Sequence, residues 1–130
     1  MWHEEFIMVN KIIIALCLFF VTQNAFSQGT ESTSELYQQC SIIEETAEEY
    51  MHATFCLGYL SGFIDSYRLM DAFNKNNNSK SIACLPNKGI NIDYLRNLFL
   101  YYVNKSPVSL NDTARITLMK ILIIAYPCGR

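Results

Sequence analysis

The sequence lacks the long apolar run and the surplus of positive charge that mark two large classes of protein. Its longest uninterrupted apolar run, at residues 12–21, has ten residues, whereas a helix needs about 20 to cross a membrane. Residues 28–130 contain nine basic and ten acidic side chains, and a nucleic-acid-binding domain would show a clear basic excess. We therefore expect neither a membrane-spanning helix nor a nucleic-acid partner.

The common catalytic motifs are also missing. The sequence contains no G-x-S-x-G, no H-E-x-x-H and no phosphate-binding loop, which argues against three large enzyme classes. His52 is the one histidine after residue 27, and a lone histidine on a helix is more often a surface or capping residue than a catalyst. Asp65 closes the uncharged run of residues 55–64, but no second titratable group matches it for acid–base work. We expect Asp65 to bond backbone amides or a tyrosine, in a binding protein without enzymatic activity, cofactor or metal.

The N-terminal residues have the order of a secretory signal peptide. Lys11 precedes the apolar run, and the small-x-small triplet Ala25-Phe26-Ser27 follows it, which is the order of charge, apolar core and cleavage site that directs export. We predict cleavage after Ser27, with Met8 as an alternative start. The mature chain, residues 28–130, would then carry no stable membrane anchor, and its length suits one domain with one core.

Four cysteines remain after the leader, at Cys40, Cys56, Cys84 and Cys128. None of them forms a C-x-x-C pair, so a redox motif or a zinc ribbon is not expected. An even number of cysteines in a small exported domain predicts two disulfides. Three pairings are possible; we prefer Cys56 with Cys84 and Cys40 with Cys128, while a helical hairpin would instead allow Cys40 to join Cys56.

Apolar residues recur at helical intervals in four segments. Capping-box spacing at Ser32 and Glu35, and again at Thr46 and Glu49, places the first helix from about residue 34 and the second over residues 48–73. The third helix is predicted at residues 92–104 and the fourth at residues 113–126. No segment alternates as a strand does, so we predict an all-α fold, a small bundle of four to five helices stabilised by disulfides.

Two glycines lie inside the second predicted helix, where each costs about 1 kcal/mol relative to alanine. Gly58 and Gly62 are four residues apart, so they lie on one face of that helix. Such a pair usually permits another backbone to come close. We therefore expect the second helix to be the central one, against which the others pack.

Polar loops and exposed aromatic residues supply the candidates for binding a partner. Residues 74–81 contain no apolar residue and many asparagines, which predicts an exposed, mobile loop; it could be a tolerated insertion or a contact loop. Tyr94 and Tyr101 fall off the apolar face of the third helix. The full set of partner-binding candidates is Asn74, Lys75, Asn76, Asn77, Tyr94, Tyr101, Lys105 and Asn111.

Four short motifs in order resemble one known family. They are Cys56-Leu57-Gly58-Tyr59-Leu60-Ser61-Gly62-Phe63-Ile64-Asp65, then Cys84-Leu85-Pro86, then a helix followed by Pro107, then Tyr126-Pro127-Cys128. This order is similar to that of the periplasmic immunity proteins that neutralise type VI secretion amidase effectors, the Rap/Tai type. The resemblance implies that the motif residues are structural, namely Gly58, Tyr59, Gly62, Asp65, Pro86, Pro107 and Pro127.

The resemblance also implies a function and an assembly. Members of this family share a fold related to periplasmic acid-stress chaperones, form homodimers and insert a loop into the cleft of the amidase. The loop would be residues 74–81 or residues 104–112. Two alternatives stay open: an acid-stress chaperone, for which the glutamates at residues 44–49 are the only hint, and an orphan envelope protein of the same fold.

Overall fold

The structure, a computed structural model, describes residues 31–43 and 45–129. These residues form helices and contain no strand, which confirms the predicted all-α fold. The elements are α2 (Thr33–Ser41), α3 (Ala47–Asn76), α4 (Ile92–Lys105), the short 3₁₀ helix η1 (Pro107–Asn111) and α5 (Ala114–Ala125). The predicted signal peptide, residues 1–27, lies outside the described residues.

The first two helices begin where their capping boxes predict. The Ser32 hydroxyl accepts from the Glu35 amide at 3.1 Å, and the Glu35 carboxylate accepts from the Ser32 amide at 3.1 Å. Thr46 and Glu49 exchange the same two bonds at 3.2 and 2.7 Å. Each box satisfies amides that have no partner inside the helix, so these local signals fix the starts of α2 and α3.

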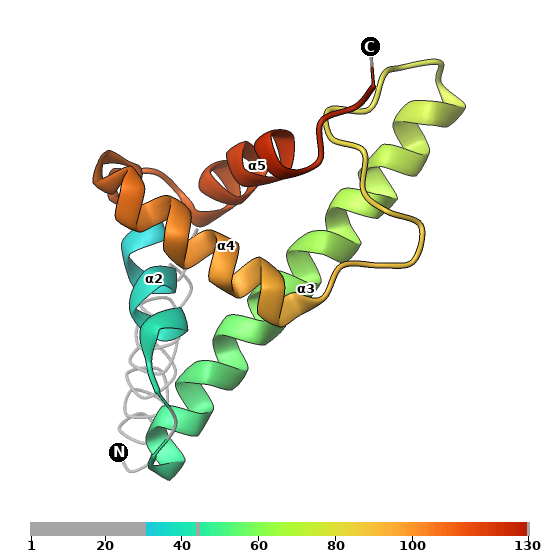
Figure 1. Cartoon of the computed structure of the whole chain (residues 1–130). Coiled ribbons are helices and arrows are strands. Elements are labelled where there is room, and N and C mark those ends of the chain that lie inside the picture. Colours follow the sequence, from blue (N-terminus) through green and yellow to red (C-terminus); the bar gives the residue numbers. More distant parts are fainter. Residues whose placement is uncertain (1–30, 44, 130) are drawn as a thin grey trace, which may run out of the picture.

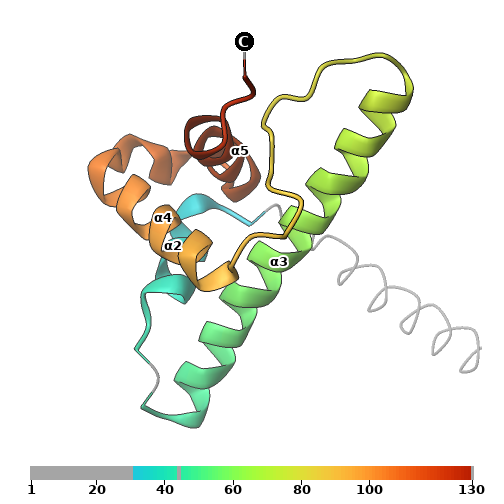
Figure 2. The same ribbon diagram turned by 45° about the vertical axis from the view of Figure 1, so that its right-hand side comes forward.

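The long helix α3 forms one edge of the molecule. Its 30 residues make it about 45 Å long, and α2, α4 and α5 all lie on the same side of it (Figures 1 and 2). The short helix α2 contacts α3, α4, η1 and α5, whereas α3 packs mainly on α2 and α4. Our prediction of α3 as the helix against which all others pack was therefore wrong, and α2 holds that place.

One apolar core lies between the helices. Its largest side chains with no exposed surface come from each of the five elements except η1, namely Leu36, Leu60, Leu95, Phe99, Leu118 and Leu122. Each buried leucine or phenylalanine contributes about 2 kcal/mol. A buried hydrogen bond of 2.8 Å between the hydroxyls of Thr33 and Thr117 joins α2 to α5 inside this core.

The four cysteines of the described residues form two disulfides, but the preferred pairing was wrong. Cys40 joins Cys56, with Cα atoms 5.1 Å apart, and Cys84 joins Cys128 at 4.9 Å. The chain reverses between α2 and α3, so that Cys40 and Cys56 face each other across a helical hairpin. The end of the chain returns to residue 84, whose amide donates to the Tyr126 carbonyl at 2.8 Å. Both bridges therefore join neighbouring segments.

Candidate protein-binding surface

The connection between α3 and α4 begins with an ordered helix end. Asn77 caps α3, and the next residue, Asn78, has a φ of 58°, a conformation that asparagine tolerates better than most residues. The Ser79 amide donates to the Asn74 carbonyl at 2.8 Å, and the Asn78 amide donates to the Lys75 carbonyl at 3.2 Å. These two bonds are the Schellman motif that ends many helices. The prediction of a mobile loop from residue 74 was therefore wrong, because residues 74–76 are the last turn of α3.

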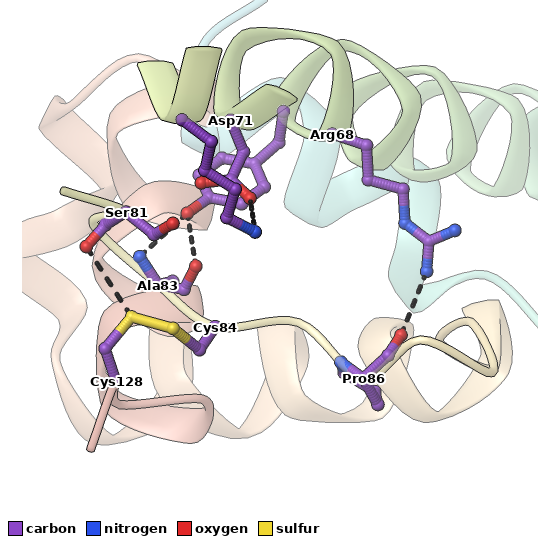
Figure 3. A network of polar contacts seen from close by, with 9 residues as sticks. Arg68, Asp71, Ser81, Ala83, Cys84, Pro86 and Cys128 are labelled. Atoms are coloured by element: carbon purple, nitrogen blue, oxygen red, sulfur yellow. Dashed lines mark hydrogen bonds and ion pairs between the residues drawn. A yellow bond between two sulfur atoms is a disulfide. The ribbon is translucent and has the colours of Figure 1, made fainter. Parts of the chain in front are cut away.

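A buried tyrosine holds the middle of this connection, which we call the α3–α4 loop (residues 77–91). The Tyr67 hydroxyl donates to the Ala83 carbonyl at 2.6 Å and accepts from the Ala83 amide at 2.7 Å. Tyr67 is 2% exposed and Ala83 fully buried. Figure 3 shows both bonds running from Ala83 toward α3. One side chain thus satisfies the two backbone groups of Ala83, which would otherwise be buried without partners.

Three further contacts brace the loop. The Cys84–Cys128 disulfide ties it to the C-terminal segment, and Arg68 of α3 donates to the Pro86 carbonyl at 3.3 Å (Figure 3). The Gly89 amide donates to the same carbonyl at 3.1 Å and closes a tight turn. Gly89 has a φ of 95°, which few other residues adopt. The loop is consequently held at both ends and at its centre.

An ion pair stabilises the end of α3 beside the loop. The Lys75 ammonium lies 2.7 Å from the Asp71 carboxylate. This hydrogen bond lowers the pKa of Asp71. Lys75, one of the partner-binding candidates, therefore has a partner within its own chain, although its side chain stays 64% exposed.

The braced loop presents two exposed tips. The first contains Lys80 and Ile82, and Ile82 is 50% exposed; the second contains Asn87 and Lys88 at the turn. Lys80 belongs to the predicted contact loop of residues 74–81, whereas Ile82 and Lys88 were not among the predicted binding residues. The position of Ile82, directly after a run of eight asparagines, lysines and serines, could have pointed to it as an apolar residue at the edge of an exposed loop.

The candidates on α4 divide into two groups. Tyr94, 53% exposed, lies near the loop and close enough to Tyr126 to raise the pKa of that tyrosine, after the larger effect of burial. Tyr101, 62% exposed, is near the other end of α4, where the Lys105 ammonium lies 5.8 Å from its ring. Tyr94 and Lys105 are eleven residues apart, which corresponds to about 16 Å along a helix. The structure therefore groups Tyr94 with the α3–α4 loop and leaves Tyr101 and Lys105 near η1, which carries Asn111.

The glycines of the first motif do not contact another helix of the described chain. Apart from the neighbouring backbone of α3 itself, no described atom lies within 4 Å of a Cβ atom built on Gly58 or Gly62, so the expected close approach is not made by residues 31–43 or 45–129. Asp65 is exposed, and no hydrogen bond of its carboxylate to a described residue is found, contrary to the expected bond to a backbone amide or a tyrosine. Tyr59 is half-buried, and burial raises its pKa.

The remaining motif residues are prolines at turns. Pro107 begins η1, where its fixed φ suits the first helical position. Pro127 follows Tyr126, which caps α5. Pro86 provides the carbonyl that Arg68 and Gly89 share. Each proline thus starts or ends a turn, which fits the structural role that the resemblance implies.

The one histidine of the described residues lies at the contact of α3 with α2. His52 forms a hydrogen bond with Gln39 and lies 3.9 Å from Glu48, so it helps to join α3 to α2. Among residues 31–43 and 45–129, no three histidine, cysteine or acidic side chains lie close enough together to hold a metal ion. In the same residues, no helix combines the length and the apolar character that crossing a membrane requires.

Comparison with known proteins identifies the family. A search of curated proteins and a search of solved structures gave no match. The family model of the Rap1a immunity proteins matches residues 32–128, which include the four α-helices of the described residues, both disulfides and every motif described above. The chain therefore belongs to the Rap1a family of immunity proteins.

Proposed function

We propose that this immunity protein is exported to the periplasm, where it binds and blocks a cognate type VI secretion effector that cleaves peptidoglycan as an amidase. The signal-peptide pattern of residues 1–27 supports export, and the family supports a cognate effector as the partner. We propose that the protein acts as a homodimer and does not itself catalyse a reaction.

The braced α3–α4 loop is the observation that carries this proposal. A loop that blocks a cleft binds more tightly when it is already ordered, because less conformational entropy is lost on binding. Tyr67, the Cys84–Cys128 disulfide and Arg68 provide that order. The tips at Ile82 and Lys88 remain exposed, so they can enter a cleft of the effector. We therefore favour this loop over residues 104–112 as the blocking element.

Two matched pairs of substitutions test the choice of loop. Ile82→Ala with Lys88→Glu changes one apolar and one basic residue of the α3–α4 loop. Tyr101→Ala with Lys105→Glu makes the same kind of change at the other end of α4. We expect the first pair to weaken binding to the cognate amidase by about tenfold or more, since exposed anchor residues carry most of an interface's energy, and the second by less than about threefold.

The partner must first be found. Affinity capture from periplasm with the oxidised protein should recover a secreted amidase, encoded beside this gene. Expressing that amidase in the periplasm should then lyse cells unless this protein is present. Lysis that is unchanged by this protein would remove the proposal, and equal losses from both substituted pairs would remove the choice of loop.

The alternative of an acid-stress chaperone has less support. It needs carboxylates whose protonation loosens the fold or the dimer. Among the glutamates at residues 44–49, Glu49 caps α3 and Glu45 and Glu48 are exposed, which suits a solvated helix start. Holdase activity at pH 2 to 3 would favour the chaperone.

A further inference from the structure

The outer face of α3 is apolar, although no described helix covers it. The buried residues of α3 are Ala53, Cys56, Leu60, Ile64 and Tyr67, and α2, α4 and α5 lie on that side (Figures 1 and 2). On the opposite face four large side chains, Met51, Phe55, Leu69 and Phe73, are 70%, 46%, 62% and 59% exposed. Large apolar side chains that are exposed together on one face of a helix point to an interaction site.

Small residues lie between these large ones. Gly58, Gly62 and Ser66 follow one another at intervals of four and are all exposed. The two glycines line an open hollow of about 510 Å³, which the Arg115 side chain of α5 also borders. Apart from the neighbouring backbone of α3 itself, no described atom lies within 4 Å of a Cβ built on either glycine. The glycines cost α3 about 2 kcal/mol together, while their missing side chains allow another helix to come close. We call the seven residues the α3 outer stripe: Met51, Phe55, Gly58, Gly62, Ser66, Leu69 and Phe73.

The α3 outer stripe is symmetric about Gly62. Gly58 and Ser66 lie four residues from it on either side, Phe55 and Leu69 lie seven residues away, and Met51 and Phe73 lie eleven residues away. A second α3 laid antiparallel across Gly62 would therefore place small residues against small ones and large apolar residues against large apolar ones. A two-fold symmetric contact requires a surface that is self-complementary in this way.

The charges on α3 also favour an antiparallel pair of these helices. Residues 31–67 contain seven acidic residues and no lysine or arginine, whereas residues 68–130 contain nine basic and three acidic residues. The N-terminal half of α3 carries Glu48 and Glu49 and no lysine or arginine, whereas its C-terminal half carries two acidic and two basic residues. An antiparallel pair therefore keeps the two acidic N-terminal halves apart. A parallel pair would bring the two acidic N-terminal halves of α3 together.

We propose that the α3 outer stripe joins two copies of this chain, with their α3 helices antiparallel and crossing at Gly62. This inference rests on the homodimer of the proposed function and names its interface. The four large side chains leave on the order of 400 Å² exposed on each copy, about half of what one partner buries in a standard interface. Flanking residues such as Tyr59 and Phe63, which line the same hollow, supply further contact area.

Substitutions within and outside the stripe test the proposal by sedimentation velocity of the oxidised protein. Gly62→Leu and Phe73→Glu should each raise the dimer dissociation constant by about tenfold or more. Val108→Glu, at a 76% exposed residue of η1, makes the same change as Phe73→Glu outside the stripe and should leave it unchanged. Gly62→Leu should not lower the thermal midpoint of the monomer, because its side chain enters open space, so a loss of dimer cannot be attributed to misfolding.

Single cysteines test the orientation. Gly62→Cys lies on the proposed two-fold axis and should form a disulfide between copies. Phe73→Cys should not, because two copies of residue 73 would be about 33 Å apart in an antiparallel pair. Crosslinking of Phe73→Cys alone would show a parallel pair and overturn the proposed geometry.

The remaining outcomes separate this inference from the proposed function. A protein that is monomeric at every concentration, or a dimer that Gly62→Leu leaves intact, overturns the interface even if the protein still protects cells from the amidase. A dimer that Gly62→Leu breaks supports the interface even if neither form protects cells, and that failure would count against the amidase alone.

Discussion

The Tyr67 hydroxyl is the residue-scale feature on which the order of the α3–α4 loop depends most. It bonds both backbone groups of the buried Ala83, so its removal leaves a buried amide and a buried carbonyl without partners. Each such group costs about 1–3 kcal/mol. The loop is therefore sensitive to the loss of a single oxygen atom that lies far from its exposed tips.

We predict that Tyr67→Phe lowers the free energy of unfolding by about 2–4 kcal/mol, measured by urea denaturation of the oxidised protein. Tyr37→Phe is the matched control. Its hydroxyl donates to Asn104 at 2.8 Å in an exposed position, where water can replace the bond, so the loss should stay below about 1 kcal/mol. Equal losses from the two substitutions would contradict the role given to Tyr67.

Three carboxylates should titrate away from their ordinary pKa. Hydrogen bonds from Ser32 lower the pKa of Glu35, and hydrogen bonds from the Glu45 amide and then from Thr46 lower the pKa of Glu49. Burial, and then the charge of Glu35, raise the pKa of Glu31. Carbon-detected NMR titration should show these directions, and Ser32→Ala should return Glu35 toward its ordinary value.

The sign of each shift sets its effect on stability. The stabilisation from Glu35 and Glu49 is fully present above the pKa of an unfolded glutamate, about 4.3, and is lost as the pH falls through their lower folded values. Glu31 acts in the opposite direction, because its raised pKa favours folding as the pH falls. Titration of Glu35 or Glu49 above the unfolded value would contradict the capping bonds.

At the scale of the helices, the two disulfides differ in accessibility. Cys40 and Cys56 are fully buried between α2 and α3, whereas Cys84 is exposed and Cys128 half-buried. Thiol–disulfide exchange requires access to the sulfur atoms. The bridge that holds the α3–α4 loop is thus the one that a reductant can reach in the folded protein.

We predict that mild reduction opens Cys84–Cys128 before Cys40–Cys56, as measured by alkylation and mass spectrometry. Loop-closure entropy assigns about 4 kcal/mol to the first bridge and about 3 kcal/mol to the second. Replacing Cys84 and Cys128 by serine should therefore destabilise the protein and loosen the loop while the far-UV helical signal is kept. Simultaneous reduction of both bridges would argue that the whole fold opens first.

Local signals made the helices predictable from the sequence, whereas contacts between distant segments could not be predicted. The capping residues Ser32, Thr46 and Asn91 lie next to the helices that they start, so their spacing in the sequence carries the information. The pairing of Cys40 with Cys56 depends on how α2 and α3 are arranged, and spacing alone allowed three pairings. Residues 74–76 were misplaced because asparagines suit both a loop and a helix end.

At the scale of the whole molecule, both the immunity family and the all-α fold were predicted from the sequence. The sequence order of the motifs pointed to the immunity family, which the match over residues 32–128 confirms. It could not reveal the bracing by Tyr67 or the exposed Ile82, since both depend on contacts between segments. Nor did it reveal that Gly58 and Gly62 face away from the core, because periodicity gives the faces of a helix and not their neighbours.

Each bridge joins a cysteine to the next one in the sequence, since Cys40 pairs with Cys56 and Cys84 with Cys128. A chain that enters an oxidising compartment N-terminus first presents its thiols in this same order. An oxidase that links consecutive thiols as they arrive would form the native bridges directly, without later shuffling. Cells that lack a disulfide isomerase but keep the oxidase should therefore accumulate the protein at its normal level.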